Sequence, residues 1–322
     1  MLIYCNSRGN NSITIVFVLP HRFYTEKKAW KAGKSNHSNP GMKTVIAFTL
    51  VLVVAAQAAD WHKILSKRNA IKASDAEISS IVGGKVASPV VFRVFPFQVA
   101  ISIDGQRFCG GSLIKEDQVL TAARCCSGAK FFEITLGANN LNLFEPSRQI
   151  VHSYNATVHE QFDQSGYEND ICIIHLEAAV RGEGIDTIRL PSRSQVNENF
   201  VGYSANVSGW GFTANDAPMS SQLVYTSVIV LDNNFCKQFY KNFTDKIICT
   251  YDIFYGSGIC DADSGGPLTI IESDGVKTQV GIANFSHPRK VGGCELFRPN
   301  GHCRLTAYLD WIQMVAGVAI RP

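Results

Sequence analysis

The sequence has ten cysteines but no Cys-x-x-Cys pair, and it has no apolar run long enough to predict a transmembrane helix. The missing Cys-x-x-Cys pairs argue against a structural zinc site. Ten cysteines in 322 residues instead indicate an oxidising compartment in which disulfides form. No helical period of useful length occurs before the C-terminus, so the pattern favours a β-rich protein.

Basic residues are not in excess over most of the chain, although the formal net charge is +3. Residues 1–80 carry 11 Lys and Arg against 4 Asp and Glu, which leaves 19 basic and 23 acidic residues in 81–322. The larger part is therefore mildly acidic, and nothing in it suggests nucleic-acid binding.

Residues 42–59 have the pattern of a secretory signal peptide, with Lys43, a short apolar run and a small-residue ending. Because a signal peptide belongs at the N-terminus, we expect residues 1–41 to be translated upstream sequence. One aberrant long signal or anchor is the alternative. Residues 60–80 are polar and are expected to form a pro-segment. These features predict a secreted, extracellular protein.

Short β-strands separated by polar turns are predicted along the rest of the chain, at 95–103, 131–137, 149–155 and 171–176. Asp104-Gly105 is a strong hairpin signal after the first of these strands. Many short strands at regular spacing argue for a barrel or a sandwich.

Three motifs then occur in a fixed order. They are Val-Leu-Thr-Ala-Ala-Arg-Cys at 119–125, Glu-Asn-Asp-Ile-Cys at 168–172, and Gly-Ile-Cys-Asp-Ala-Asp-Ser-Gly-Gly-Pro-Leu at 258–268. Together they resemble the base, acid and nucleophile motifs of the chymotrypsin-like serine proteases, and the resemblance covers roughly 81–317.

The resemblance implies an all-β fold within 81–322: two antiparallel six-stranded β-barrels packed around a cleft, with a C-terminal α-helix. The barrels are expected at about 81–190 and 200–305, and the helix at about 305–317.

The resemblance places Asp170 and Ser264 at two positions of the catalytic triad, but Arg124 replaces the histidine base. We expect Arg124 to pair with Asp170. An arginine does not release its proton near neutral pH, so it cannot act as the base. A single-base sequencing error would also give arginine for histidine, but several further departures around the same cleft argue against an error.

Those departures affect the oxyanion hole, expected from Ala262 and Ser264, where Ala262 replaces a glycine. If that position needs a positive φ, its Cβ costs about 1–2 kcal/mol. The expected substrate pocket has an uncharged floor at Gly258 and larger side chains than usual, and its residues are Gly258, Ile259, Asn284, Phe285, Ser286 and Asn300. A trypsin-like preference is therefore excluded.

Ile81-Val82-Gly83-Gly84 resembles the mature N-terminus of the family, in which the new amine of Ile81 would pair with Asp263. The preceding residue is Ser80 rather than Arg or Lys. Either a protease other than a trypsin-like activator cuts this bond, or the chain remains zymogen-like.

The resemblance also implies disulfides, and a further pair is expected from two extra cysteines that follow triad positions. The expected pairs are Cys109–Cys125, Cys126–Cys172, Cys236–Cys249 and Cys260–Cys294. Cys303 is left without a partner and is expected to be an inert thiol. Glycosylation sequons are expected to be used at Asn155, Asn242 and Asn284, and less so at Asn206. No metal or cofactor is expected.

Three functions remain open. The first is a secreted, non-catalytic, monomeric homologue that binds extracellular proteins, for example proteases or protease inhibitors, as decoy, cofactor or regulator of proteolysis. The second is an active serine endopeptidase that prefers small or apolar residues. The third is a structural or storage protein.

Overall fold

The computed structural model describes residues 2–6, 14–18, 85–86, 95–164, 166–215, 217–252, 258–285, 293–295 and 298–322; at 2–6, 14–18, 85–86 and 295 it describes the backbone alone. The expected signal peptide, the pro-segment, Ile81 and Ser286 lie outside the described residues. The chain divides into two units, Met1–Lys63 and Ile64–Pro322. In the first unit, strands β1 (Leu2–Asn6) and β2 (Thr14–Val18) form an antiparallel pair.

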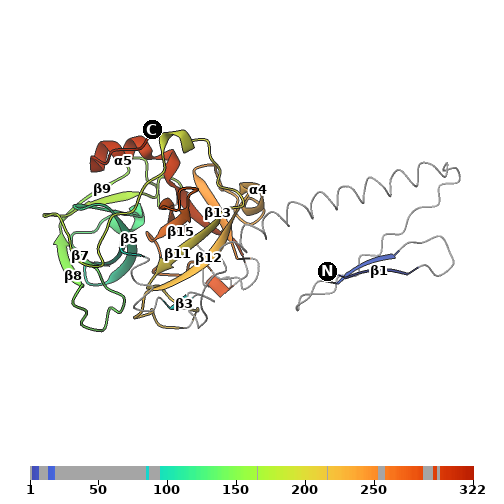
Figure 1. The fold of residues 1–322 in the computed structure, drawn as a ribbon, viewed down its shortest axis with the longest axis horizontal. Coiled ribbons are helices and arrows are strands. Elements are labelled where there is room, and N and C mark those ends of the chain that lie inside the picture. Colours follow the sequence, from blue (N-terminus) through green and yellow to red (C-terminus); the bar gives the residue numbers. More distant parts are fainter. Residues whose placement is uncertain are drawn as a thin grey trace. The chain divides into compact units, whose positions relative to one another are not determined.

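The second unit contains two antiparallel sheets, as expected for an all-β fold. The strands of the first sheet are β4 (Gln98–Ile103), β5 (Arg107–Lys115), β6 (Gln118–Thr121), β7 (Phe132–Leu136), β8 (Gln149–Ser153), β9 (Asn155–Val158) and β10 (Cys172–His175). The strands of the second are β3 (Lys85–Val86), β11 (Ser204–Gly209), β12 (Val224–Leu231), β13 (Ile247–Tyr251), β14 (Pro267–Ile271), β15 (Lys277–Phe285) and β16 (Asn300–Arg304). Figure 1 shows the two sheets side by side, with helix α5 (Leu309–Ala316) along one end.

Each sheet has seven strands where six were expected. In the first sheet the extra strand arises because β8 and β9 are one strand interrupted at Tyr154, with β8 pairing with β7 and β9 with β10. The Ser153 hydroxyl accepts from the amide of Asn155 at 3.1 Å and donates to the carbonyl of His175 at 2.6 Å, which satisfies the backbone at the break. In the second sheet β11 pairs with β12 to close the ring, and the two residues of β3 are added outside β12.

The helical end also differs from expectation. The expected helix at 305–317 consists of a 3-10 turn, Leu305–Ala307, followed by α5. Gly317 ends α5 at a φ of 60°, a left-handed conformation that glycine adopts without steric cost. The Asp104-Gly105 hairpin has the predicted geometry, with φ values of 53° and 66°.

Two reciprocal hydrogen bonds join the barrels through buried side chains. The Ser112 hydroxyl of the first barrel donates to Gln279 of the second at 2.6 Å, and the Ser208 hydroxyl of the second donates to Gln98 of the first at 2.7 Å. Because these four side chains are buried, their pairing fixes one barrel against the other.

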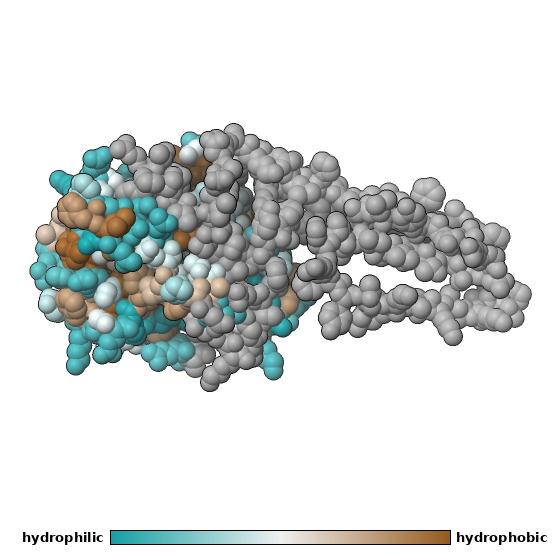
Figure 2. Space-filling model, turned by 90° about the horizontal axis from the view of Figure 1, so that it is seen from below, coloured by the Kyte–Doolittle hydropathy of each residue, from teal (hydrophilic) through white to brown (hydrophobic). Residues whose placement is uncertain are grey.

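Large exposed hydrophobic side chains lie on the loop between β7 and β8 and on β8 itself. Leu143 is 59% exposed, Phe144 89% and Ile150 45%. Figure 2 shows hydrophobic residues gathered on the part of the surface that the first barrel forms. The loop is held from within, because Arg148 donates to the carbonyls of Leu141 and Leu143, each at 3.0 Å.

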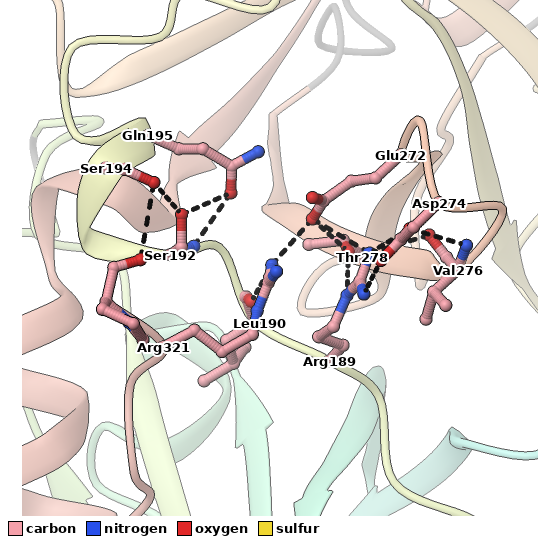
Figure 3. Close-up of polar contacts among 11 residues, drawn as sticks. Arg189, Leu190, Ser192, Ser194, Gln195, Glu272, Asp274, Val276, Thr278 and Arg321 are labelled. Carbon is pink, nitrogen blue, oxygen red and sulfur yellow. Dashed lines mark hydrogen bonds and ion pairs between the residues drawn. The ribbon is translucent and has the colours of Figure 1, made fainter.

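The connector after the first barrel is anchored to the second by an ionic cluster (Figure 3). Arg189 donates to both carboxylate oxygens of Asp274, at 2.6 and 2.9 Å, and to the Thr278 hydroxyl at 2.8 Å. Arg321, next to the C-terminus, donates to Glu272 at 2.8 Å. The connector and the C-terminal segment are therefore attached to the same β14–β15 hairpin.

The described part of the chain contains neither a candidate membrane-spanning helix nor a candidate metal site. No helix there is long and apolar enough to span a bilayer. No group of His, Cys, Asp and Glu side chains there is arranged to hold a metal ion.

Candidate active site

Arg124 lies on the short helix α3 (Ala123–Cys126), which follows β6 directly. Its Nε donates to Asp170 Oδ2 at 2.6 Å, and its backbone N–H donates to Asp170 Oδ1 at 2.9 Å. The Arg124 side chain is 34% exposed, whereas that of Asp170 is fully buried. The guanidinium and the carboxylate are therefore paired, and the pair is open to solvent only on the arginine side.

Asp170 is held by the turn that precedes β10. Asn169 has a φ of 56°, its amide donates to the Tyr308 hydroxyl at 3.0 Å, and its side-chain oxygen accepts from Lys246 at 3.2 Å. Burial raises the pKa of Asp170, whereas the charge and hydrogen bonds of Arg124 act to lower it. Tyr308 and Lys246 were not identified from the sequence, because they lie far from the motif along the chain.

The second terminal nitrogen of Arg124 is directed to the other barrel. Nη2 donates to Asn284 Oδ1 of β15 at 2.5 Å, and Asn284 Nδ2 donates to the Tyr167 carbonyl at 2.5 Å. Arg124 thus bridges an aspartate of the first barrel and an asparagine of the second. Asn284 is 1% exposed, so its amide is not accessible to a glycan in this conformation, and glycosylation there stays an untested prediction that this burial argues against. Asn155 and Asn242 are exposed, and their use stays a prediction.

Ser264 is partly exposed at the start of a turn held by backbone hydrogen bonds. Its carbonyl accepts from the Gly110 amide at 2.9 Å, and the Gly265 amide donates to the Ala283 carbonyl at 2.8 Å. Gly265 has a φ of 86°, and a Cβ there would overlap the Gly110 carbonyl oxygen, so the turn requires glycine. The Ser264 hydroxyl forms no hydrogen bond with any residue that the structure describes, and Arg124 has no side-chain lone pair with which to accept one.

Asp263, next to the nucleophile, is 2% exposed and accepts two backbone hydrogen bonds. The Gly211 amide donates to Oδ1 at 2.9 Å and the Cys260 amide to Oδ2 at 3.0 Å. Burial raises the pKa of Asp263 to about 7, while the two amides act in the opposite direction. The expected partner, the amine of Ile81, lies outside the described residues.

At the expected oxyanion hole, Ala262 has a φ of 70°, so the condition for strain at this position is met. A non-glycine residue in this region costs about 1–2 kcal/mol.

The expected pocket is occupied by the protein's own side chains. A Cβ on Gly258 would overlap Asn300 Oδ1, so the asparagine amide occupies the space above Gly258. Phe285 is 7% exposed and packs on Tyr167 with ring centroids 4.0 Å apart. Ile259, which was expected to line the pocket, is 4% exposed and packs in the core of the second barrel.

The four histidines that the structure describes are engaged elsewhere and do not lie at the position expected for the base. His302 is fully buried, bonds Thr250 through Nε2 at 2.8 Å, and has a pKa lowered by burial to about 3. His159 packs against Trp311 with tilted rings, and His175 forms a hydrogen bond with Thr157. His152 lies 3.6 Å from Glu133, in the first barrel.

The structure joins the four cysteine pairs that the sequence indicated. They are Cys109–Cys125, Cys126–Cys172, Cys236–Cys249 and Cys260–Cys294. Cys303 is a buried free thiol whose pKa is raised by burial, in keeping with an inert side chain.

Comparison with known proteins agrees with this architecture. The sequence model of the family described as Trypsin matches residues 81–312. Brachyurin of Leptuca pugilator is 37% identical over 74% of this chain and 99% of its own length. Chymotrypsin of Phaedon cochleariae is 34% identical over 72% of this chain and 81% of its own length. The solved structure of HL collagenase superimposes with a TM-score of 0.65 at 33% identity, over 74% of this chain and all of that one.

The chain belongs to the trypsin family of chymotrypsin-like serine proteases. Its relatives carry the names of active proteases, whereas this chain has Arg124 beside its acid and nucleophile positions.

Proposed function

We propose that the protein is a secreted, non-catalytic member of this family that acts by binding, as a decoy, cofactor or regulator of proteolysis. The observation that carries the proposal is the 2.6 Å contact between Arg124 Nε and Asp170 Oδ2. The side chain in the place of the base carries only donor N–H groups and a positive charge, so it cannot accept the proton of the Ser264 hydroxyl.

The loss of the base is large enough to decide between activity and inactivity. Removing the histidine from a triad on another fold costs about 10⁶ in turnover. At about 1.4 kcal/mol per decade, this is roughly 8 kcal/mol of transition-state stabilisation. The altered oxyanion position and the occupied pocket add to this loss.

A binding role fits the exposed hydrophobic side chains of the first barrel. Phe144 is 89% exposed on a loop braced by Arg148, and a rigid exposed aromatic residue is a typical protein contact. We infer extracellular proteins as partners, either proteases or protease inhibitors.

Labelling of Ser264 by a phosphonofluoridate on correctly processed protein tests the proposal. We expect no labelling of the wild type and measurable labelling of Arg124→His, which restores a base. Labelling of the wild type at the rate of an ordinary protease contradicts the proposal. If Arg124→His also fails, the altered oxyanion position and pocket contribute to the inactivity.

An active endopeptidase is the second candidate, and the names brachyurin, chymotrypsin and collagenase among the relatives favour it. Such an enzyme would prefer small or apolar side chains, because Gly258 and Asn300 carry no charge. Turnover of peptide esters by pure protein at ordinary rates would establish this candidate. A structural or storage role is the third, and a pull-down from the native secretion that recovers no specific partner would favour it.

A further inference from the structure

The guanidinium of Arg124 has one edge left over after its structural contacts. Nε donates to Asp170 and Nη2 to Asn284, while Nη1 donates to no residue that the structure describes. Because the group is planar, its Nη1 edge faces away from the Nε–Nη2 edge that holds Asp170 and Asn284. A third of the side chain, 34%, is open to solvent. The arginine therefore retains a charged donor that can reach a ligand.

The loop around Ser264 also has two backbone amides that donate to no described acceptor. The amides of Asp263, Gly265 and Gly266 donate to described carbonyls at 3.1, 2.8 and 2.9 Å. The amides of Ala262 and Ser264, which alternate with them, donate to none within the described ranges, and both residues are partly exposed. Free amides of a tight turn that contains a left-handed residue form a concavity that binds anions.

The charge of the site also differs from that of the family's triad. A neutral histidine beside an aspartate leaves the site with a net negative charge, whereas Arg124 neutralises Asp170. A second guanidinium is close, because Arg107 Nη1 donates to the Arg124 carbonyl at 3.2 Å. The exposed Asp261 and the buried Asp170 balance the two arginines, so the site lacks the net negative charge of an aspartate beside a neutral histidine.

We propose that the former catalytic centre is a carboxylate-binding site that takes the free C-terminus of a peptide. Arg124 Nη1, the Ser264 hydroxyl and the amides of Ala262 and Ser264 supply the donors. Asn300 occupies the uncharged space above Gly258, so the last residue of the peptide has a small, uncharged side chain. This inference rests on the proposed non-catalytic function and names the ligand class of the same site.

Fluorescence anisotropy with an N-terminally labelled peptide tests the site directly. The peptide ends in alanine and is made once with a free carboxylate and once as the amide. We expect the acid to bind at least about tenfold more tightly, which corresponds to about 1.4 kcal/mol. Inorganic phosphate and acetate are added as competitors, and we expect competition only in large excess, because they lack the peptide's backbone and side chain.

Three variants separate this site from general positive charge. Arg124→His keeps a partner for Asp170, and we expect the preference for the acid to fall below about threefold. Arg107→Gln removes a nearby charge without touching the guanidinium at the site, and the preference should persist. Ser264→Ala removes any covalent chemistry together with the hydroxyl donor. The acid should then bind more weakly than to the wild type but still more tightly than the amide, because Arg124 and the two backbone amides remain.

Equal affinity for the acid and amide peptides overturns the inference. So does a preference for the acid that persists in Arg124→His, or one that Arg107→Gln abolishes to the same extent as Arg124→His. Displacement by acetate or phosphate as effective as by the peptide shows a site for small anions and also overturns it. Labelling of wild-type Ser264 by the phosphonofluoridate would contradict the proposed function. It would not decide whether the site prefers a free carboxylate, because that preference is also measured in Ser264→Ala. If the phosphonofluoridate does not label the wild type and the acid and amide peptides bind equally, only the carboxylate-site inference is contradicted.

Discussion

Two buried carboxylates lie in different barrels, and their surroundings differ. Asp170 of the first barrel is fully buried against a guanidinium, and Asp263 of the second is 2% exposed and accepts only two amide hydrogen bonds from described residues. The first carboxylate is electrically neutralised within the folded domain. The second retains the surroundings in which a new N-terminal amine would be needed.

The difference separates the two sides of the site. On the nucleophile side, the glycines at 209, 211 and 265 keep the close approaches that the turn and Asp263 require. On the acid and base side, Arg124 forms new contacts with both Asp170 and Asn284. The glycines thus support the turn around Asp263 and Ser264, while Arg124 forms an ion pair at the position where the resemblance places the base.

The largest expected effect is on Asp170. Arg124→Ala leaves a fully buried carboxylate without its counter-ion, and we expect it to lower the free energy of unfolding by about 3 to 5 kcal/mol. Urea unfolding followed by tryptophan fluorescence measures this loss. The double variant Arg124→Ala/Asp170→Asn should recover part of it, since no charge is then left unpaired. A loss below about 1 kcal/mol would mean that Arg124 does not stabilise Asp170.

The next largest effect on stability is expected from the Cys126–Cys172 disulfide, which lies beside the Arg124–Asp170 pair. Cys126 and Cys172 each lie two residues beyond Arg124 and Asp170, and their bond closes a separation of 46 residues. Replacing both by alanine should lower the free energy of unfolding by about 2 to 4 kcal/mol through the added freedom of the unfolded chain. The matched control is the double alanine variant of Cys236 and Cys249, whose separation is 13 residues, and it should lose less. An equal or larger loss in the control would contradict a chain-entropy explanation.

The pH dependence distinguishes the two carboxylates from each other. The pKa of Asp263 is raised to about 7, so the folded chain holds this proton more tightly than the unfolded chain does. Its contribution to stability is therefore fully present below about pH 4 and is lost as the pH rises toward 7, with a slope of at most about 1.4 kcal/mol per unit. In Asp263→Asn the part of the pH dependence of the unfolding free energy that comes from Asp263 should be absent. Subtracting the variant's curve from the wild-type curve removes the contributions of the other titrating groups, including Asp170.

Processing sharpens the same measurement. If cleavage before Ile81 supplies an amine to Asp263, the carboxylate becomes stable in its charged form and the slope should disappear in the processed chain. An unchanged slope after cleavage at Ser80–Ile81 would contradict the pairing of Ile81 with Asp263.

Much of the fold followed from the sequence because local signals and motifs agreed. The Asp104-Gly105 hairpin, the strands near 131–137, 149–155 and 171–176, and the four disulfide pairs all agree with the structure within a few residues. The interruption at Tyr154 was not predicted, because it depends on the hydrogen bond from Ser153 to His175, a contact between strands.

The site was predicted in its positions but not in its contacts. The sequence indicated a pair between Arg124 and Asp170, but not the turn of Nη2 toward Asn284 or the anchoring of Asn169 by Tyr308. A sequon at 284–286 predicted an exposed asparagine, whereas burial in β15 makes Asn284 a bridge between barrels. Such outcomes depend on which side chains meet across the cleft, and no local pattern carries that information.

The smallest expected effect tests the nucleophile side alone. Ala262→Gly removes a Cβ held at a φ of 70°, which relieves about 1–2 kcal/mol, while glycine costs about 0.5–1 kcal/mol in unfolded-chain entropy. The net gain in the free energy of unfolding should therefore be about 1 kcal/mol or less. Ala122→Gly, at a φ of −82°, is the matched control and should lose stability, since no strain is relieved there. In an Arg124→His background, Ala262→Gly should increase labelling of Ser264, because the cost of orienting the oxyanion amide falls. No increase would place the remaining defect in the pocket that Asn300 occupies.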